Sequence, residues 1–230
     1  MLKLAELVRE RDLEGVMEAA REFHGHICPY VALGVRASTM ALDELGAERL
    51  DSGGSVEEAL LAIVECNNCF VDGVQVTTGC TLGNNSLIYF DLGKNALTLV
   101  RRGSWEGVRL YVDSERLREE YFSEEATELF EKVVTRRSGT PQDAARLKRL
   151  WEEIGRQMLE LPREMFKIDK VRLPPVELAP IFKSLRCSQC GELAMETRMV
   201  YVDEKPLCFK CAGRGFHALI GRGIVDELKK

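Results

Sequence analysis

Two CxxC pairs near the C-terminus constrain this chain of 230 residues more than any other sequence feature. The pairs span Cys187–Cys190 and Cys208–Cys211, and seventeen residues separate them. Because four sulfurs at this spacing can surround one zinc ion tetrahedrally, we expect a structural zinc site with all four cysteines as ligands. Four filled positions leave none for a substrate, so the metal is expected to stabilise the fold rather than to act in catalysis.

The residues around these cysteines predict the rest of a small finger. Residues 199–202 read as a strand that enters a turn at 203–205, and Cys208 and Cys211 would then begin a closing helix. A knuckle, a hairpin and a helix in this order predict a treble-clef finger. Two independent redox CxxC pairs or a disulfide pair are the alternative interpretations, and His217 is an alternative ligand.

Composition and charge limit the compartment and the partners. The chain is 45% hydrophobic and 30% charged, which is typical of a globular protein. The N-terminal residues lack the apolar stretch of a signal peptide, and no segment approaches the roughly 20 apolar residues of a membrane span. We therefore expect a cytoplasmic protein with reduced thiols and no membrane association. Residues 181–230 carry nine Lys and Arg against six Asp and Glu, a net charge of +3, which is too small an excess to predict nucleic-acid binding.

Length and proline content predict two domains joined by a linker. A chain of 230 residues fits one ordinary domain plus a small appendage. Three prolines between residues 174 and 180 mark a stiff connecting segment. We expect a core domain over residues 1–170, a linker over 171–184 and the finger over 185–230.

A first cluster of potential metal ligands comprises His24, His26 and Cys28. Apolar residues at helical spacing over 12–23 predict a helix that ends at His24. Pro29 favours the first position of a second helix, which places Cys28 at its N-cap. Because the positive end of the helix macrodipole stabilises a thiolate there, Cys28 is predicted to be reactive or metal-bound rather than an inert buried thiol.

A second cluster contains Cys66, Cys69 and Cys80. The apolar run 60–65 predicts a buried strand that ends at Cys66. Helical spacing in the following residues places Cys69 at the start of a helix and Asp72 on the same face. Cys80 follows the end of that helix, so it can meet Cys69 only through the tertiary fold.

The remaining segments predict an α+β layout. Segments 86–90 and 96–100 flank Gly93-Lys94-Asn95, whose residues are typical of a hairpin turn. A further strand is expected after them, followed by helices over about 115–137 and 141–160. The second of these helices has an apolar stripe suited to core packing or to a dimer seam.

Two segments resemble the signatures of the FmdE family, which is named after formylmethanofuran dehydrogenase. They run from Phe23 to Arg36 and from Cys69 to Gly83, and the proline linker with the four-cysteine finger resembles the two-domain members. The resemblance implies a thioredoxin-like α+β core with a mixed sheet flanked by helices, a treble-clef C-terminal domain, homodimers and a metal-binding active site beside the His and Cys signatures. Tyr30, where the family often has Gly, and Cys66, an additional thiol, depart from the pattern.

Three classes of function fit these residues, and the first is a metal-dependent enzyme. The candidate core ligands are His24, His26, Cys28, Cys69 and Cys80. A subset of them would hold zinc or iron with one position open for water or a small-molecule substrate. Asp72 would support the ligands or act as a base, which makes Cys28, Cys69 and Asp72 the candidate catalytic residues.

The other two classes need no open metal position. In a redox carrier, the Cys66–Cys69 pair would cycle as a dithiol, or these two thiols with Cys28 and Cys80 would hold an iron–sulfur cluster. In a binding module, the protein would deliver metal to a larger oxidoreductase or assist its assembly. Mixed His and Cys ligands suit an open zinc or iron site better than a cluster, so the first class ranks ahead. The family resemblance links it to anaerobic one-carbon or molybdenum/tungsten oxidoreductase metabolism.

Overall fold

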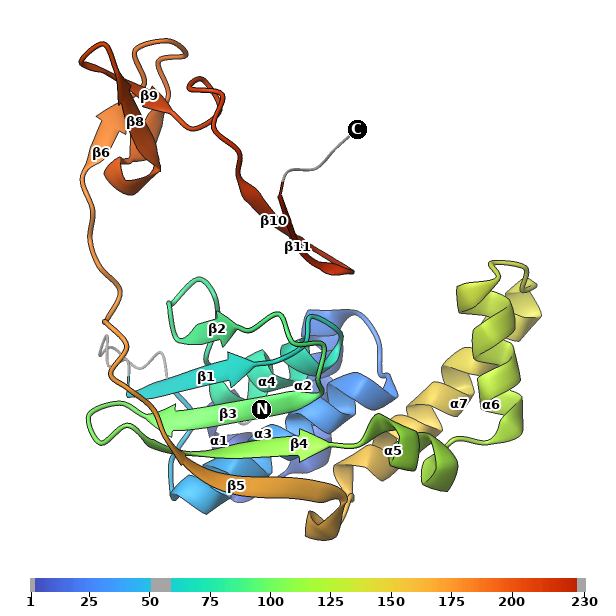
Figure 1. Cartoon of the computed structure of the whole chain (residues 1–230). Coiled ribbons are helices and arrows are strands. Elements are labelled where there is room, and N and C mark those ends of the chain that lie inside the picture. Colours follow the sequence, from blue (N-terminus) through green and yellow to red (C-terminus); the bar gives the residue numbers. More distant parts are fainter. Residues whose placement is uncertain (1–2, 51–58, 227–230) are drawn as a thin grey trace. The chain divides into compact units, whose positions relative to one another are not determined.

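The computed structural model describes residues 3–50 and 59–226 (Figure 1). The chain divides into two compact units, Met1–Val176 and Glu177–Lys230. The first unit holds helices α1–α7 and strands β1–β5, and the second holds strands β6–β11. None of the helices in the described ranges is long and apolar enough to cross a membrane.

The first unit follows a helical N-terminal half with a sheet and further helices. Its helices are Leu4–Glu10 (α1), Leu13–His24 (α2), Pro29–Leu45 (α3), Phe70–Thr78 (α4), Ser114–Tyr121 (α5), Glu124–Phe130 (α6) and Pro141–Leu159 (α7). Its strands are Leu60–Val64 (β1), Leu87–Tyr89 (β2), Ala96–Arg101 (β3), Glu106–Val112 (β4) and Phe166–Arg172 (β5).

The five strands form one mixed sheet in the order β2-β1-β3-β4-β5. β1 pairs in parallel with β2 and antiparallel with β3, and the other two pairings are antiparallel. All five residues of β1 are buried, as expected for a central strand whose sequence is apolar without alternation. The α+β class and the mixed sheet predicted from the sequence are confirmed.

The hairpin predicted around Gly93 is wrong, because β2 and β3 do not pair with each other. β1 lies between them, and the loop that joins them closes over the end of β1. Lys94 donates its backbone N–H to the Glu65 carbonyl at 2.8 Å, and Phe90 donates to the Val64 carbonyl at 2.9 Å. Gly93 does turn the chain, with a φ of 65°, but the backbone partners of the loop come from an earlier strand.

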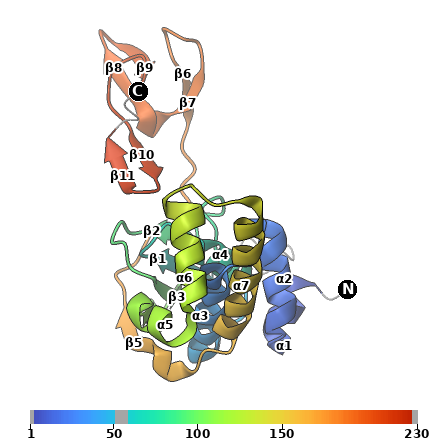
Figure 2. The same ribbon diagram turned by 90° about the vertical axis from the view of Figure 1, so that its right-hand side faces the viewer.

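Helices α2, α3, α4 and α7 cover one face of the sheet (Figure 2). α3 is buried along almost its whole length and packs directly on α4. At their crossing, a Cβ added to Gly34 would lie 2.1 Å from the Phe70 carbonyl oxygen, and one added to Gly73 would lie 2.2 Å from the Val31 carbonyl oxygen. Because only glycine fits there, the crossing fixes the N-terminal ends of α3 and α4 relative to each other.

The single helix expected over 115–137 is wrong in its extent. Ser123 starts a new helix, α6, because its hydroxyl accepts a hydrogen bond from the Ala126 N–H and satisfies a donor at the helix start. α6 then continues into a π-helical segment over Glu131–Thr135. The helix expected over 141–160 is confirmed as α7, and its apolar stripe packs into the core.

The second unit is built from short hairpins. Its strands are Ser184–Arg186 (β6), Leu193–Met195 (β7), Met199–Val202 (β8), Lys205–Cys208 (β9), His217–Ile220 (β10) and Gly223–Asp226 (β11). They pair two by two, β6 with β7, β8 with β9 and β10 with β11. The turn predicted before residue 205 is confirmed, because Asp203 and Glu204 both have positive φ between β8 and β9.

The closing helix predicted from Cys208 onward is wrong. One helical turn does begin there, since the Ala212 N–H donates to the Cys208 carbonyl at 2.9 Å. Gly213 then takes a φ of 64°, which ends the turn, and the chain continues into the β10–β11 hairpin. The finger therefore has a hairpin where the sequence predicted a helix.

Candidate metal centres

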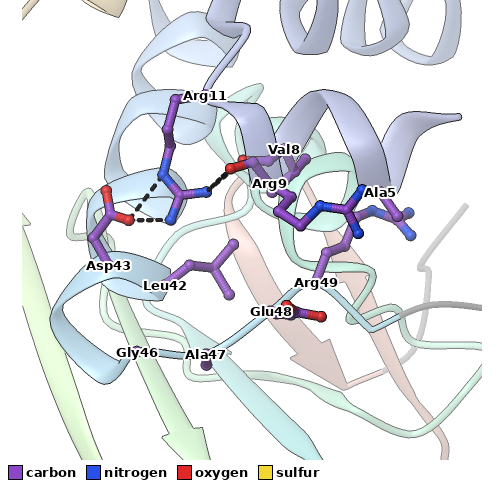
Figure 3. Close-up of a pocket in the computed structure, with 10 residues that line it drawn as sticks. All are labelled: Ala5, Val8, Arg9, Arg11, Leu42, Asp43, Gly46, Ala47, Glu48 and Arg49. Carbon is purple, nitrogen blue, oxygen red and sulfur yellow. Dashed lines mark hydrogen bonds and ion pairs between the residues drawn. The ribbon is translucent and has the colours of Figure 1, made fainter. Parts of the chain in front are cut away.

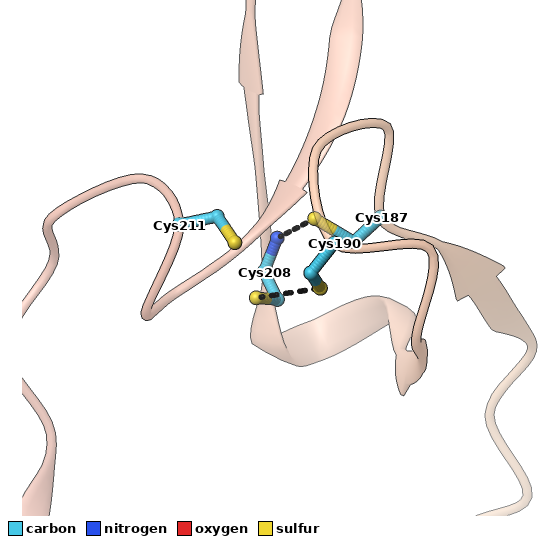
Figure 4. Close-up of side chains that lie close together, drawn as sticks. All are labelled: Cys187, Cys190, Cys208 and Cys211. Carbon is cyan, nitrogen blue, oxygen red and sulfur yellow. Dashed lines mark hydrogen bonds between the residues drawn. The ribbon is translucent and has the colours of Figure 1, made fainter.

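The four finger cysteines meet at one point, as Figure 4 shows. Their sulfur atoms all lie within 4.8 Å of one another. Because a tetrahedral zinc–thiolate centre with bonds of about 2.3 Å has sulfur–sulfur distances of roughly 3.8 Å, this set needs only a small contraction to fit the ion. Cys187 and Cys190 follow β6, whereas Cys208 ends β9 and Cys211 lies in the next turn.

Backbone groups in the finger favour the thiolate form of its cysteines. The Cys208 N–H donates to Cys187 Sγ at 3.4 Å. Hydrogen bonds from the backbone of Cys190 and of Cys208 lower the pKa of Cys187 to about 6. The sulfurs of Cys190 and Cys208 are 4.0 Å apart. Donor type, spacing and charge therefore all fit a structural zinc ion.

In the first unit, the end of α2 and the start of α3 carry the first cluster of candidate ligands. α2 ends at His24, and Gly25 turns the chain at a φ of 95°. Cys28 is the N-cap of α3, as the sequence predicted. Gly155 of α7 packs against this loop so closely that an added Cβ would lie 2.9 Å from Ile27 Cγ2. The loop is thus held by three helices.

His24, His26 and Cys28 form a candidate ligand set whose ligand atoms all lie within 4.8 Å of one another. Asp72 accepts a hydrogen bond from His24 Nδ1 at 2.6 Å, and its other oxygen accepts one from Gln75 at 3.2 Å. His24 Nε2 is buried and has no hydrogen-bond partner among the described residues. A carboxylate that orients the ring and leaves the second nitrogen free is typical of a metal-bound histidine.

The ring of His26 lies beside that of His24, with the ring centroids 4.6 Å apart. Burial lowers the pKa of His26, and the neighbouring His24 and Lys148 lower it further. This favours the neutral imidazole, which is the form that binds a metal. Lys148 belongs to α7, and no sequence pattern indicates its position because only the tertiary fold brings α7 beside this loop.

Cys69, the N-cap of α4, adds a half-buried thiol next to Cys28. A hydrogen bond from the Cys28 thiol lowers the pKa of Cys69 to about 6, and the nearby His24 lowers it too. The same hydrogen bond, together with burial, raises the pKa of Cys28. Both thiols cap helix N-termini, so the macrodipoles of α3 and α4 both favour negative charge on this pair.

The structure does not bring Cys66 and Cys80 into this group. The Cys66 thiol donates to Asn68 Oδ1 at 3.6 Å, and burial raises its pKa to about 11. Cys80 is fully buried beside Thr78, just beyond the C-terminal end of α4. Cys69 lies at the opposite end of the same helix. The four thiols proposed for an iron–sulfur cluster are therefore spread along the fold.

A surface cavity of about 280 Å³ lies at a different place, beside α1 and the end of α3 (Figure 3). Arg9, Arg11 and Arg49 line it together with Asp43 and Glu48. Arg11 Nε donates to Asp43 at 2.8 Å, so part of this charge is compensated within the cavity wall. None of the ligands predicted from the sequence lines this cavity.

Comparison with known families assigns both units. The family described as "FmdE, Molybdenum formylmethanofuran dehydrogenase operon" matches residues 23–167, which include every candidate core ligand. The chain belongs to the FmdE family. In this FmdE chain, residues 180–214 match the prokaryotic dksA/traR C4-type zinc finger, so the second unit contains a zinc finger, as predicted.

Two individual proteins resemble this FmdE chain. The "Probable S-adenosyl-L-methionine-binding protein" of Archaeoglobus fulgidus is 61% identical over 206 residues, which are 90% of this chain and 54% of that protein. The chain thus spans about half the length of this curated relative. The crystal structure of an FmdE-like protein of tungsten formylmethanofuran dehydrogenase, from Syntrophus aciditrophicus, aligns with a TM-score of 0.57 and 27% identity, over 87% of this chain and 92% of that chain. The first unit therefore has an FmdE-like fold.

Proposed function

We propose that this FmdE protein binds two metal ions of different kinds. Cys187, Cys190, Cys208 and Cys211 bind a structural zinc ion in the finger. In the first unit, His24, His26 and Cys28 bind zinc or iron. Three protein ligands are typical of catalytic zinc sites, which keep one position open, and Cys69 lies beside that position.

His24 Nε2 is the observation that carries this proposal. A buried imidazole nitrogen without a partner costs about 1–3 kcal/mol relative to a paired one. The ring cannot turn away to relieve this cost without losing the hydrogen bond between Nδ1 and Asp72. A metal ion at Nε2 would satisfy the nitrogen while keeping that hydrogen bond.

Asp72 is proposed to position His24 rather than to act as a base. One of its oxygens accepts from His24 and the other from Gln75. A zinc or iron ion at this site would supply Lewis acidity to a bound water or substrate. Cys69, half-buried and next to Cys28, is the side chain best placed to contact a ligand in the open position.

The metabolic role we propose is in anaerobic one-carbon or molybdenum/tungsten oxidoreductase metabolism. It is supported by the family description, which names the operon of molybdenum formylmethanofuran dehydrogenase. The same association supports a second candidate, in which the protein delivers metal to a larger oxidoreductase or helps to assemble it. An iron–sulfur carrier ranks below both, because Cys66 and Cys80 lie away from the other thiols.

The name of the Archaeoglobus relative adds S-adenosyl-L-methionine as a candidate ligand. Because that protein is nearly twice as long as the matching region, the comparison does not say which half binds it. Calorimetric titration of this chain with S-adenosyl-L-methionine tests the point. Measurable heat of binding would place the ligand on the shared half, and no heat would leave it to the other half.

We also propose a homodimer, as the family resemblance implied. The apolar stripe of α7 does not supply its seam, because Leu147, Leu150 and Ile154 are buried inside the first unit. Light scattering after gel filtration should give twice the mass of the 25.9 kDa chain.

Metal analysis of anaerobically purified protein tests the core centre. The wild-type protein should contain two metal equivalents per chain. Cys28→Ser and His26→Ala should each lose about one equivalent, whereas the matched control Cys80→Ser should keep both. If Cys28→Ser and His26→Ala both retain the wild-type content, these residues are not ligands and the metal-dependent function is wrong.

A further inference from the structure

Cys28 and Cys69 are in hydrogen-bond contact although 40 residues of sequence separate them. Each is the N-cap of a helix, Cys28 of α3 and Cys69 of α4. The close crossing at Gly34 and Gly73 lies within the first two turns of both helices, so it fixes the distance between the two caps. Their proximity is therefore built into the helix packing and does not depend on a bound ion.

The four core thiols differ in their access to solvent. Cys69 is half-buried, whereas Cys28, Cys66 and Cys80 are 2%, 4% and 0% exposed. A small reagent from solution thus meets Cys69 first. Cys28, which is buried directly behind it, is the next thiol in reach.

We propose that Cys28 and Cys69 form a reversible disulfide that excludes metal from the core centre. The oxidant is a low-molecular-weight disulfide. The Cys69 thiolate attacks one of its sulfurs and forms a mixed disulfide, and the first small thiol leaves. Cys28 sulfur then attacks the Cys69 sulfur and the second small thiol leaves. Two cysteine thiols are oxidised by two electrons, one small disulfide is reduced to two thiols, and the two protons pass to these products.

The CxxC spacing alone would have paired Cys69 with Cys66 instead. The structure disfavours that pair, because the Cys66 thiol donates to Asn68 Oδ1. Asn68 is itself held in place, since the same oxygen accepts from the Phe70 N–H at 3.0 Å and its amide donates to Asn95 at 2.9 Å. Pairing Cys66 with Cys69 would disrupt this network at the start of α4, whereas pairing Cys28 with Cys69 leaves it intact.

Only the competition with metal rests on the proposed function, because the disulfide requires nothing but the two thiols. Cys28 is one of the three proposed ligands, so its oxidation would leave two. Two separate measurements on the full chain distinguish the disulfide from the metal site.

The first measurement identifies the disulfide. Metal-depleted protein is given one zinc equivalent per chain to restore the finger, treated anaerobically with oxidised glutathione, alkylated and digested with Asp-N protease. Cys28 then lies in peptide 12–42, and Cys66 and Cys69 lie in peptide 51–71. We expect these two peptides to be joined, to separate on addition of dithiothreitol, to stay joined in Cys66→Ser and to be unjoined in Cys69→Ser. A disulfide between Cys66 and Cys69, or a peptide 12–42 that is always alkylated, would overturn the proposal.

The second measurement follows the core metal. Oxidised protein should take up one metal equivalent less than reduced protein, and reduction should restore it. Equal uptake before and after oxidation would overturn the competition. If the disulfide forms but reduced protein binds no core metal, the proposed function fails and the competition fails with it. If reduced protein binds core metal and the peptides stay unjoined, the proposed function stands and the disulfide is wrong.

Discussion

The two candidate metal centres use the same donor atoms but are built in opposite ways. In the finger, short hairpins carry the cysteines, and large apolar side chains such as Leu193 and Tyr201 remain 60% and 64% exposed. In the first unit, the ligands lie at the ends of helices whose other faces are already buried in the core. The metal therefore organises the finger, whereas the fold organises the core centre.

Removal of one finger ligand should have the largest effect. Structural zinc contributes about 10–16 kcal/mol to the folding of small fingers, so Cys208→Ser should unfold the second unit. Limited proteolysis should then cut within residues 185–220 and spare the first unit. The matched control is Cys80→Ser, which removes a thiol outside both ligand sets. If Cys208→Ser made the first unit as sensitive to protease as the finger, the contrast between the two centres would be lost.

Substitution of Gly34 should have the next largest effect. Its added Cβ would lie 2.1 Å from the Phe70 carbonyl oxygen, so Gly34→Ala should force α3 and α4 apart and destabilise the first unit by about 3 kcal/mol. Urea denaturation measures this change. Gly83→Ala is the control, because its nearest neighbour would be 3.9 Å away, and its effect should stay within about 0.5 kcal/mol. Equal midpoints for the two variants would show that the crossing does not hold the core centre.

Replacement of Asp72 should weaken the core centre alone. Asp72→Asn keeps the size of the side chain but removes the charge that orients His24, and such partners typically contribute 10- to 100-fold in metal affinity. Competition with a chromophoric chelator measures the affinity of each site. Zinc affinity of the finger serves as the internal control. An unchanged core affinity would mean that the bond to His24 does not serve metal binding.

The smallest effect is expected for His217, the alternative finger ligand. It lies on β10, is 78% exposed and pairs with Asp226 at 2.7 Å, outside the set of four cysteines. His217→Gln should therefore retain the full zinc content and the protease resistance of the finger. A loss of zinc in this variant would make His217 a ligand and would displace one of the cysteines.

Local features were the part of this fold that the sequence could predict. The end of α2 at His24, Cys28 as an N-cap and the β8–β9 turn all follow from residues adjacent in the chain. The hairpin at Gly93 was wrong because the backbone partners of that loop come from β1. The closing helix of the finger was wrong because Gly213 ends the turn at Cys208.

The candidate core centre was predictable in its residue types but not in its geometry. No local pattern shows that Asp72 orients His24, that Cys69 meets Cys28 or that Cys80 lies at the far end of α4. These relations depend on how α3 crosses α4, and that crossing is set by two glycines whose close contacts are visible only in three dimensions.

Hydrogen exchange of the full chain, with and without metal, tests the central contrast most directly. Amide protection is compared between zinc-loaded protein and protein stripped by a chelator under reducing conditions. We predict that residues 185–220 lose protection on stripping, while β1, α3 and α4 keep theirs, because apolar packing holds the core centre without an ion. Loss of protection in α3 and α4 together with the finger, or full protection of the stripped finger, would contradict this account.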